Sequence, residues 1–242
     1  MRVRIAAVGD IHMSEDLRGR FRARLDGIEE RADVLLLAGD LTRHGTAEEG
    51  RVVADEFRGL PIPVVAVLGN HDYHSDAEEA IAVLLRDSGI TVLNDNATVI
   101  ERDGMTLGVV GGKGFGGGFA GKCASEFGEP ETKAFVRHTK EIAERWRVAL
   151  KETQADHRVV LAHYSPVKDT LEGEPKEIYP FLGSYLLAEA VDAEGADLIL
   201  HGHAHLGTEK GVTPGGIRVR NVALPVLGRA YGVYRLGKEE TP

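Results

Sequence analysis

The sequence is poor in the features that mark secreted and membrane-spanning proteins. Cys123 is the single cysteine among 242 residues, which excludes an intramolecular disulfide and a multi-cysteine zinc site. No apolar run reaches the roughly 20 residues that a membrane-spanning helix needs. The first residues, MRVRIAAVGD, reach charge and glycine too early for a secretory signal peptide. We therefore expect a cytoplasmic protein without a membrane-embedded part.

Positive charge is also scarce. The chain has 29 Lys and Arg against 38 Asp and Glu, a formal net charge of −9. Such a surface does not attract a polyanion over its whole area, which argues against duplex nucleic acid as a partner. A small phosphorylated substrate would have to be attracted locally, and bound divalent cations could do this. Length and ordinary composition fit one domain over residues 1–242, and the oligomeric state stays open.

Apolar runs alternate with amphipathic segments along the chain. Strands are predicted at 3–8, 34–38, 63–68, 98–100, 106–110, 158–162, 197–200, 217–222 and 232–236. Such strands alternating with helices predict an α/β fold whose parallel sheet is covered on both faces. Helices are expected over 17–28 and 135–146. Two more are expected to begin at the capping boxes Thr46/Glu49 and Ser75/Glu78. The segment Gly111–Gly128 is expected to be a loop.

Polar side chains follow five of the predicted strands. Ligands of open α/β sheets collect beyond the carboxyl ends of strands, so these side chains should meet at one rim. Glycine precedes four of the five groups, which suits sharp turns and close backbone approach. The groups are Asp10 and His12, Asp40, Asn70 and His71, His163, and His203 with His205.

These residue types suit metal chemistry. Imidazole and carboxylate bind Mn, Fe and Zn well, and a carboxamide oxygen such as that of Asn70 adds a neutral ligand. Seven ligands exceed the four or so that one zinc ion takes, but they suit two ions that share a bridging ligand. Such a pair can hold a phosphate and activate a water together. We expect two divalent ions, with Mn or Fe favoured and Zn, Ni or Mg as alternatives.

The polar side chains belong to five short motifs at the ends of the predicted strands. These are Gly-Asp-Ile-His (9–12), Gly-Asp-Leu-Thr (39–42), Gly-Asn-His-Asp (69–72), Ala-His-Tyr-Ser-Pro (162–166) and Gly-His-Ala-His (202–205). Together and in this order, they resemble the motifs of the calcineurin-like metallophosphoesterase superfamily. The resemblance implies a four-layer α/β/β/α sandwich of two mixed sheets, with a binuclear metal site at the carboxyl ends of the strands. It also implies hydrolysis of a phosphate ester.

The resemblance assigns a role to each matching position. Asp10, His12 and His205 would hold the first metal; Asn70, His163 and His203 would hold the second; and Asp40 would bridge the two. His71 would contact the phosphoryl group and protonate the leaving oxygen. Asp72 would orient His71, although a backbone carbonyl could do so instead.

The motif forms bear on the substrate. Gly-Asn-His-Asp in place of Gly-Asn-His-Glu argues against the phosphoserine/threonine phosphatases, and this form resembles that of small bacterial phosphodiesterases. We expect a phosphodiesterase acting on a small substrate such as a cyclic nucleotide or a glycerophosphodiester. A phosphomonoesterase and a nuclease are the alternatives within the enzymes. A metal-free interaction scaffold is disfavoured because all seven ligands are present.

Four further residues could contact substrate. His44 and His74 closely follow motif residues and could line the rim. Phe115 and Phe119 lie in the glycine-rich segment 111–121, which could form a mobile wall beside the metals. A buried anchoring role for the two phenylalanines is an equal alternative. The segment lacks the Gly-Lys-Ser/Thr ending of a phosphate-binding P-loop.

Overall fold

The computed structural model describes residues 2–102 and 104–237. Its strands form two large mixed sheets. The first sheet has the order β13 (Gly232–Leu236), β1 (Val3–Val8), β2 (Val34–Ala38), β3 (Val64–Val67) and β4 (Thr91–Val92). The second has the order β11 (Lys210–Val212), β12 (Arg218–Asn221), β10 (Leu198–His201), β9 (His157–Ala162), β6 (Met105–Gly112) and β5 (Asn96–Arg102).

The central strands of both sheets are parallel, as the apolar runs of the first ninety residues predicted for the first sheet. β1 to β4 run parallel in the first sheet, and β6, β9, β10 and β12 run parallel in the second. Antiparallel strands close the edges: β13 pairs with β1, β5 with β6, and β11 with β12. The parallel strands therefore bring their carboxyl ends to one rim of each sheet.

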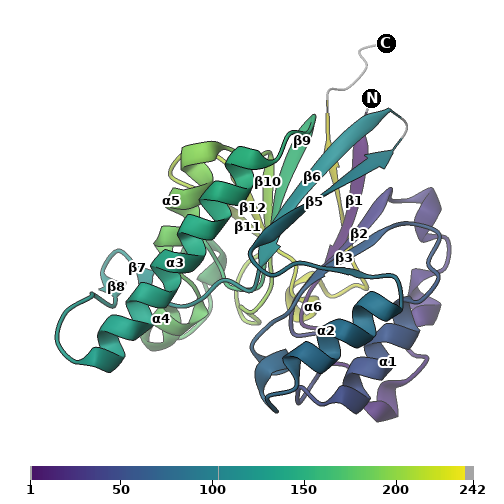
Figure 1. Cartoon of the computed structure of the whole chain (residues 1–242), viewed down its shortest axis with the longest axis horizontal. Helices are drawn as coiled ribbons and strands as arrows, with labels where there is room; N and C mark the ends of the chain where they lie inside the picture. The colour runs from purple at the N-terminus through teal and green to yellow at the C-terminus, as the bar shows by residue number, and fades with distance from the viewer. Residues whose placement is uncertain (1, 103, 238–242) are drawn as a thin grey trace.

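Three apolar layers hold the sandwich together. The two sheets face each other across buried side chains that include Ile5, Leu36, Val65, Val109, Leu161 and Leu200. Helices α1 (Ala47–Phe57) and α2 (Glu78–Asp87) cover the outer face of the first sheet, and α3 (Pro130–Glu152) and α5 (Tyr185–Glu194) cover the second. Figure 1 shows these helix pairs on opposite sides of the sheets. The four-layer α/β/β/α sandwich is confirmed.

Smaller elements complete the described chain. They are the two short helices α4 (Tyr179–Leu182) and α6 (Leu224–Leu227), the hairpin of β7 (Gly118–Phe119) and β8 (Lys122–Cys123), and 3-10 turns at Glu15–Leu17, Arg22–Leu25, Ile28–Glu30, His71–Tyr73, Asp169–Leu171 and Lys176–Ile178. Within the residues described, no helix is both long and apolar enough to span a membrane.

Three local predictions are corrected by the structure. The segment 17–28 is not a continuous helix but a series of 3-10 turns. Its apolar residues Phe21, Leu25 and Ile28 are still buried, because their spacing suits either geometry. Ser75 does not cap α2; its hydroxyl donates to the carbonyl of His44, 2.7 Å away. The glycine-rich loop contains the β7–β8 hairpin. By contrast, Thr46 does cap α1, accepting from the backbone N–H of Glu49.

Candidate metal centre

The polar residues that follow five strands lie together between the two sheets' rims. Asp10 follows β1, Asp40 follows β2 and Asn70 follows β3, whereas His163 follows β9 and His203 follows β10. Three loops of the first sheet thus meet two loops of the second. The site exists only because the sandwich brings both rims to the same place.

The backbone is strained where these side chains project. Asp10, His12, Asp40 and His203 have φ angles of 57°, 43°, 50° and 71°. Residues other than glycine seldom adopt this left-handed region, and they cluster at functional sites when they do. The buried sheets on either side hold these turns in place. Part of the free energy of folding therefore offsets the backbone strain that orients the four side chains.

One group of potential ligands consists of Asp10, His12, Asp40 and His205, whose ligand atoms all lie within 4.8 Å of one another. Nε2 of His205 is 2.9 Å from Oδ1 of Asp10. Nε2 of His12 is 3.5 Å from Nε2 of His205 and 3.9 Å from Oδ2 of Asp40. Two carboxylates and two imidazoles at these separations could hold a divalent cation.

A second group consists of Asp40, His163 and His203, again with ligand atoms within 4.8 Å of one another. Nε2 of His163 is 3.2 Å from Oδ1 of Asp40 and 2.9 Å from Oδ1 of Asn70. Asp40 belongs to both groups, with Oδ2 toward His12 and Oδ1 toward His163. One carboxylate between two clusters is the arrangement that a bridging ligand needs.

Backbone carbonyls hold two of the imidazoles in place. Nδ1 of His163 is 2.9 Å from the carbonyl of Ala38, and Nε2 of His203 is 3.1 Å from the carbonyl of Phe181. In each neutral ring the nitrogen facing the carbonyl donates, which leaves the other nitrogen with a lone pair for a metal.

Burial sets the protonation of the site. It lowers the pKa of His163 well below its usual value and that of His203 to about 3, so both rings are neutral at physiological pH. Burial also raises the pKa of Asp10 to about 6, despite hydrogen bonds from His205 and His203. Asp10 and Asp40 are 2% and 1% exposed. Buried carboxylates among neutral imidazoles fit cations, because a cation offsets the cost of burying the negative charge.

Two glycines of the motifs leave space for the carboxylates. A β-carbon at Gly69 would overlap Oδ1 of Asp40, and one at Gly202 would overlap Oδ2 of Asp10. The close backbone approach expected at these positions is therefore present. A larger residue at either position would have to displace a potential ligand.

His71 lies beside Asp40, on the surface of the site. Its Nδ1 is 2.8 Å from the carbonyl of Arg43, and its Nε2 is 3.9 Å from Oδ2 of Asp40. The ring also packs edge-on against His12, with centroids 4.5 Å apart. Because Nδ1 donates to a carbonyl, Nε2 is the nitrogen that can exchange a proton with a substrate.

Of the two partners expected for His71, the structure has the backbone carbonyl and not Asp72. Its buried carboxylate accepts hydrogen bonds from the backbone N–H groups of Leu41, Thr42 and Gly69 and from the hydroxyl of Thr42. The partner of Nδ1 of His71 is a backbone carbonyl, so Asp72 does not orient His71 directly. It ties the loop after β2 to the loop after β3 and so positions both motifs. Burial raises its pKa to about 6.

The four candidate substrate contacts fall into different environments. His44 and His74 are exposed, and Nδ1 of His44 is 2.9 Å from Oε1 of Glu49. Phe115 is half-buried, with its ring 5.8 Å from that of Tyr164. Phe119 is only 4% exposed, in a small cluster with Leu171, Leu182 and Ala204. Its burial is what the anchoring alternative requires, whereas a contact of Phe119 with substrate stays a prediction.

Sequence reasoning missed Lys113, Tyr73 and Tyr164, which lie together beside the motif loops. The carbonyl of Lys113 accepts from the backbone N–H groups of His163 and Tyr164, at 3.1 and 3.0 Å. Tyr73 directly follows the Gly-Asn-His-Asp motif and Tyr164 lies within the Ala-His-Tyr-Ser-Pro motif, which is the one signal that could have singled them out. Lys113 stands among glycines, in the segment expected to be a loop and a mobile wall beside the metals, where only the two phenylalanines were singled out.

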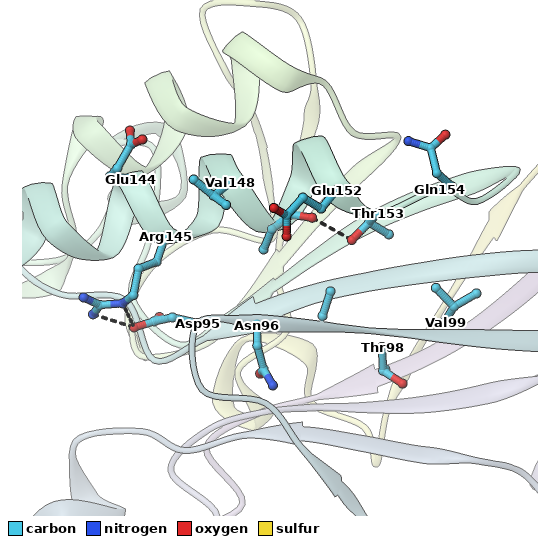
Figure 2. A pocket seen from close by; sticks show the side chains of 12 residues that line it. Asp95, Asn96, Thr98, Val99, Glu144, Arg145, Val148, Glu152, Thr153 and Gln154 are labelled. Carbon is cyan, nitrogen blue, oxygen red and sulfur yellow. Dashed lines mark hydrogen bonds and ion pairs between the residues drawn. The ribbon is translucent and has the colours of Figure 1, made fainter.

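A cavity of about 600 Å³ lies away from the metal ligands, between α3 and the edge strand β5. Figure 2 shows the side chains of α3, including Glu144, Val148 and Glu152, above Asn96 and Thr98 of β5. At one end Arg145 pairs with Asp95, with Nη2 2.7 Å from Oδ2. The described lining contains no histidine or cysteine, and none of the potential metal ligands belongs to it.

Comparisons with known proteins agree with the geometry. The family model described as calcineurin-like phosphoesterase matches residues 3–207. No curated protein matches the sequence.

Several solved structures share the fold at low sequence identity. The phosphopantetheinyl hydrolase of Mycobacterium tuberculosis has a TM-score of 0.63 at 15% identity, covering 90% of this chain and 88% of its own. The NAD nucleotidase of Haemophilus influenzae has a TM-score of 0.51 at 16% identity, covering 91% of this chain but 50% of its own. GAP50, the anchor in the inner membrane complex of Plasmodium, has a TM-score of 0.54 at 13% identity, with 93% and 72% covered.

At these identities the solved structures establish the fold alone. Membership of the family rests on the family model, which matches most of the chain. The clusters that could bind metal lie within the matched region. This chain belongs to the calcineurin-like phosphoesterase family and is a metal-dependent hydrolase of phosphate esters.

Proposed function

We propose that the protein is a binuclear phosphodiesterase acting on a small substrate, such as a cyclic nucleotide or a glycerophosphodiester. The proposal of two metal ions rests on the position of Asp40, whose two carboxylate oxygens face different groups of potential ligands. Asp10, His12 and His205 would hold one ion, and Asn70, His163 and His203 the other. Mn or Fe is favoured because carboxylate and carboxamide oxygens accompany the imidazoles.

Two bound cations supply the positive charge that holds a phosphoryl group and makes a water molecule acidic enough to attack it. The protein's own residues supply the rest. The Ala38 and Phe181 carbonyls fix the rings of His163 and His203. His71 is held by the Arg43 carbonyl with Nε2 beside Asp40. From there it can hydrogen-bond a phosphoryl oxygen or protonate the leaving oxygen.

The preference for a diester rests on the motif forms Gly-Asn-His-Asp and Gly-Asp-Leu-Thr. A phosphomonoesterase is the second candidate, and the likeness in fold to a putative 5'-nucleotidase from Staphylococcus aureus supports it. A nuclease is disfavoured by the net charge of −9. An anchoring protein shares the fold, but the grouped ligands and the raised pKa of Asp10 favour a protein that binds metal.

The test compares bis(p-nitrophenyl) phosphate with p-nitrophenyl phosphate across Mn, Fe, Zn, Ni and Mg. We expect a higher kcat/KM for the diester with at least one of these metals. A clearly higher kcat/KM for the monoester would reverse the choice between diester and monoester while leaving the metal-dependent chemistry in place. Hydrolysis of neither compound, by protein that holds two ions, would reject both.

A further inference from the structure

A second cavity adjoins the candidate metal centre and contains a cationic side chain that the mechanism does not use. It has a volume of about 570 Å³, and Lys113, Tyr73, His138 and Arg145 contribute to its lining. The cavity borders the motif loops because the carbonyl of Lys113 accepts from the backbone N–H of His163. Tyr73 ends the 3-10 turn that begins at His71. A group of the substrate other than the reacting phosphate could therefore extend into it.

Aromatic rings surround the ammonium of Lys113. Its Nζ lies 4.8 Å from the ring centre of Tyr73, 5.1 Å from that of Phe115 and 5.4 Å from that of Tyr164. Within residues 2–102 and 104–237, this ammonium has no hydrogen bond or ion pair to another side chain or to the backbone. The rings attract the positive charge through their faces and leave the N–H donors available to a ligand.

Within the part of the chain that the structure describes, no carboxylate forms an ion pair with Lys113, although those of Asp95, Asp40 and Glu78 act on its charge. Arg145 is paired with Asp95, and the same carboxylate accepts from Nε1 of Trp146 at 2.8 Å. Asp40, whose charge also acts on Lys113, belongs to both potential ligand groups. Glu78 is the remaining acidic group that acts on the ammonium. Burial lowers the pKa of Lys113, and burial followed by the charges of Lys113 and Arg145 lowers that of His138. With the two cationic side chains, this part of the cavity favours an anion.

We propose that the Lys113 cavity binds a second oxyanion of the substrate, a carboxylate or a phosphate, with the ammonium of Lys113 as its main donor. The substrate would then be a phosphodiester that carries a second negative group besides the phosphate that is cleaved. This proposal rests on the proposed phosphodiesterase function and narrows its substrate class.

The experiment compares diesters that differ only in the second charge. Phenyl p-nitrophenyl phosphate is the reference, and its 3-carboxyphenyl and 4-carboxyphenyl counterparts add a carboxylate. A counterpart with a phosphate on the phenyl ring distinguishes the two oxyanions. We expect at least one doubly charged diester to have a kcat/KM about 10-fold above the reference, the size of a charged hydrogen bond in a partly buried site.

Variants of Lys113 test whether its ammonium causes the preference for the doubly charged diester. In Lys113→Met the ratio of kcat/KM for the charged diester to that for the reference should fall about 10-fold, with the larger part in KM. Lys113→Arg should restore much of the ratio, because it restores the charge. Lys151→Met, an exposed lysine near the end of α3, should leave the ratio unchanged. Metal content and circular dichroism establish that each variant is folded.

Three outcomes would overturn the proposal. If the wild-type protein cleaves the reference but has no higher kcat/KM for the doubly charged diesters, the phosphodiesterase assignment stands and the oxyanion site is rejected. An equal loss on both diesters in Lys113→Met would place Lys113 at the reacting phosphate or in a structural role. A preference that persists unchanged in Lys113→Met would place the oxyanion site elsewhere. Failure of the wild type on every diester would instead reject the proposed function.

Discussion

Asp40 and His163 come from different sheets of the sandwich, yet Nε2 of His163 lies 3.2 Å from Oδ1 of Asp40. Asp40 follows β2 in the first sheet, and His163 follows β9 in the second. The candidate metal centre therefore spans the interface between the two sheets, and its geometry depends on how the sheets pack. Cations bound there would stabilise that packing, because binding to the folded state alone adds to its stability.

Asp40→Asn should be the most damaging change of a single ligand. A carboxylate can neutralise two cations, whereas a carboxamide is uncharged, so we expect loss of one metal and a fall in kcat of at least about 100-fold. Elemental analysis and steady-state kinetics measure both effects. Asp87→Asn, at the exposed end of α2, is the matched control. Near-normal activity with both metals retained would show that Asp40 does not bridge.

His71→Ala should lower kcat by about 10²–10⁴-fold, the usual contribution of a general acid, without changing the metal content. The loss should shrink as the leaving group becomes more acidic, because p-nitrophenolate needs little protonation and an alkoxide needs much. A series of diesters of graded leaving-group pKa measures this dependence. A constant fall in kcat along the series would mean that His71 binds the phosphate and is not the general acid. Loss of a metal from the variant would show that His71 is a metal ligand.

Gly69→Ala should disrupt the centre for lack of space. The new methyl group would overlap the carboxylate of Asp40, so metal content and activity should both fall sharply. Gly59→Ala is the control, because Gly59 has a φ of +65° with open space around its α-carbon. We expect it to lose about 1 kcal/mol of stability and to keep its metals. Full metal content in Gly69→Ala would show that the Asp40 carboxylate can shift without harm.

The affinity of the metal-free protein for cations should fall in acid. A cation needs Asp10 deprotonated, but the pKa of Asp10 is raised to about 6 by burial, and hydrogen bonding to Asp10 raises that of His205. Protons therefore compete with metal as the pH falls through about 6, and metal binding near this pH releases protons. Calorimetric titration with Mn²⁺ at about pH 5.5 and about pH 7.5, in buffers of different ionisation enthalpy, measures both effects. Equal affinity at both pH values, with no proton release, would contradict this expectation.

The layered fold was predictable because its signals are local. Continuous apolar runs such as Val34–Ala38 became buried parallel strands, and the resemblance supplied the second sheet. The segment around Phe21 and Leu25 was misjudged, because an apolar spacing of three to four residues fits both an α-helix and successive 3-10 turns. Tertiary contacts decide between them, and a sequence pattern does not contain those contacts.

The grouping of the potential metal ligands could be anticipated because each one lies within a few residues of the carboxyl end of a strand. What could not be foreseen was which backbone groups make the contacts around the site. The Arg43 carbonyl beside His71 and the bonds that tie Asp72 to Leu41 and Gly69 depend on loop conformation. Lys113 was missed for a related reason: the rings around it come from three separate segments, and no sequence spacing connects them.

The most direct test of the central claim is a metal titration of the metal-free protein, with hydrolysis of bis(p-nitrophenyl) phosphate followed at each addition and bound metal counted by elemental analysis. A binuclear phosphodiesterase should show almost no hydrolysis without metal, and its full rate should be reached only when two ions are bound per chain. A stoichiometry that stays at or below one at saturating metal while the rate is maximal, or hydrolysis that persists after the metal is removed, would contradict the account.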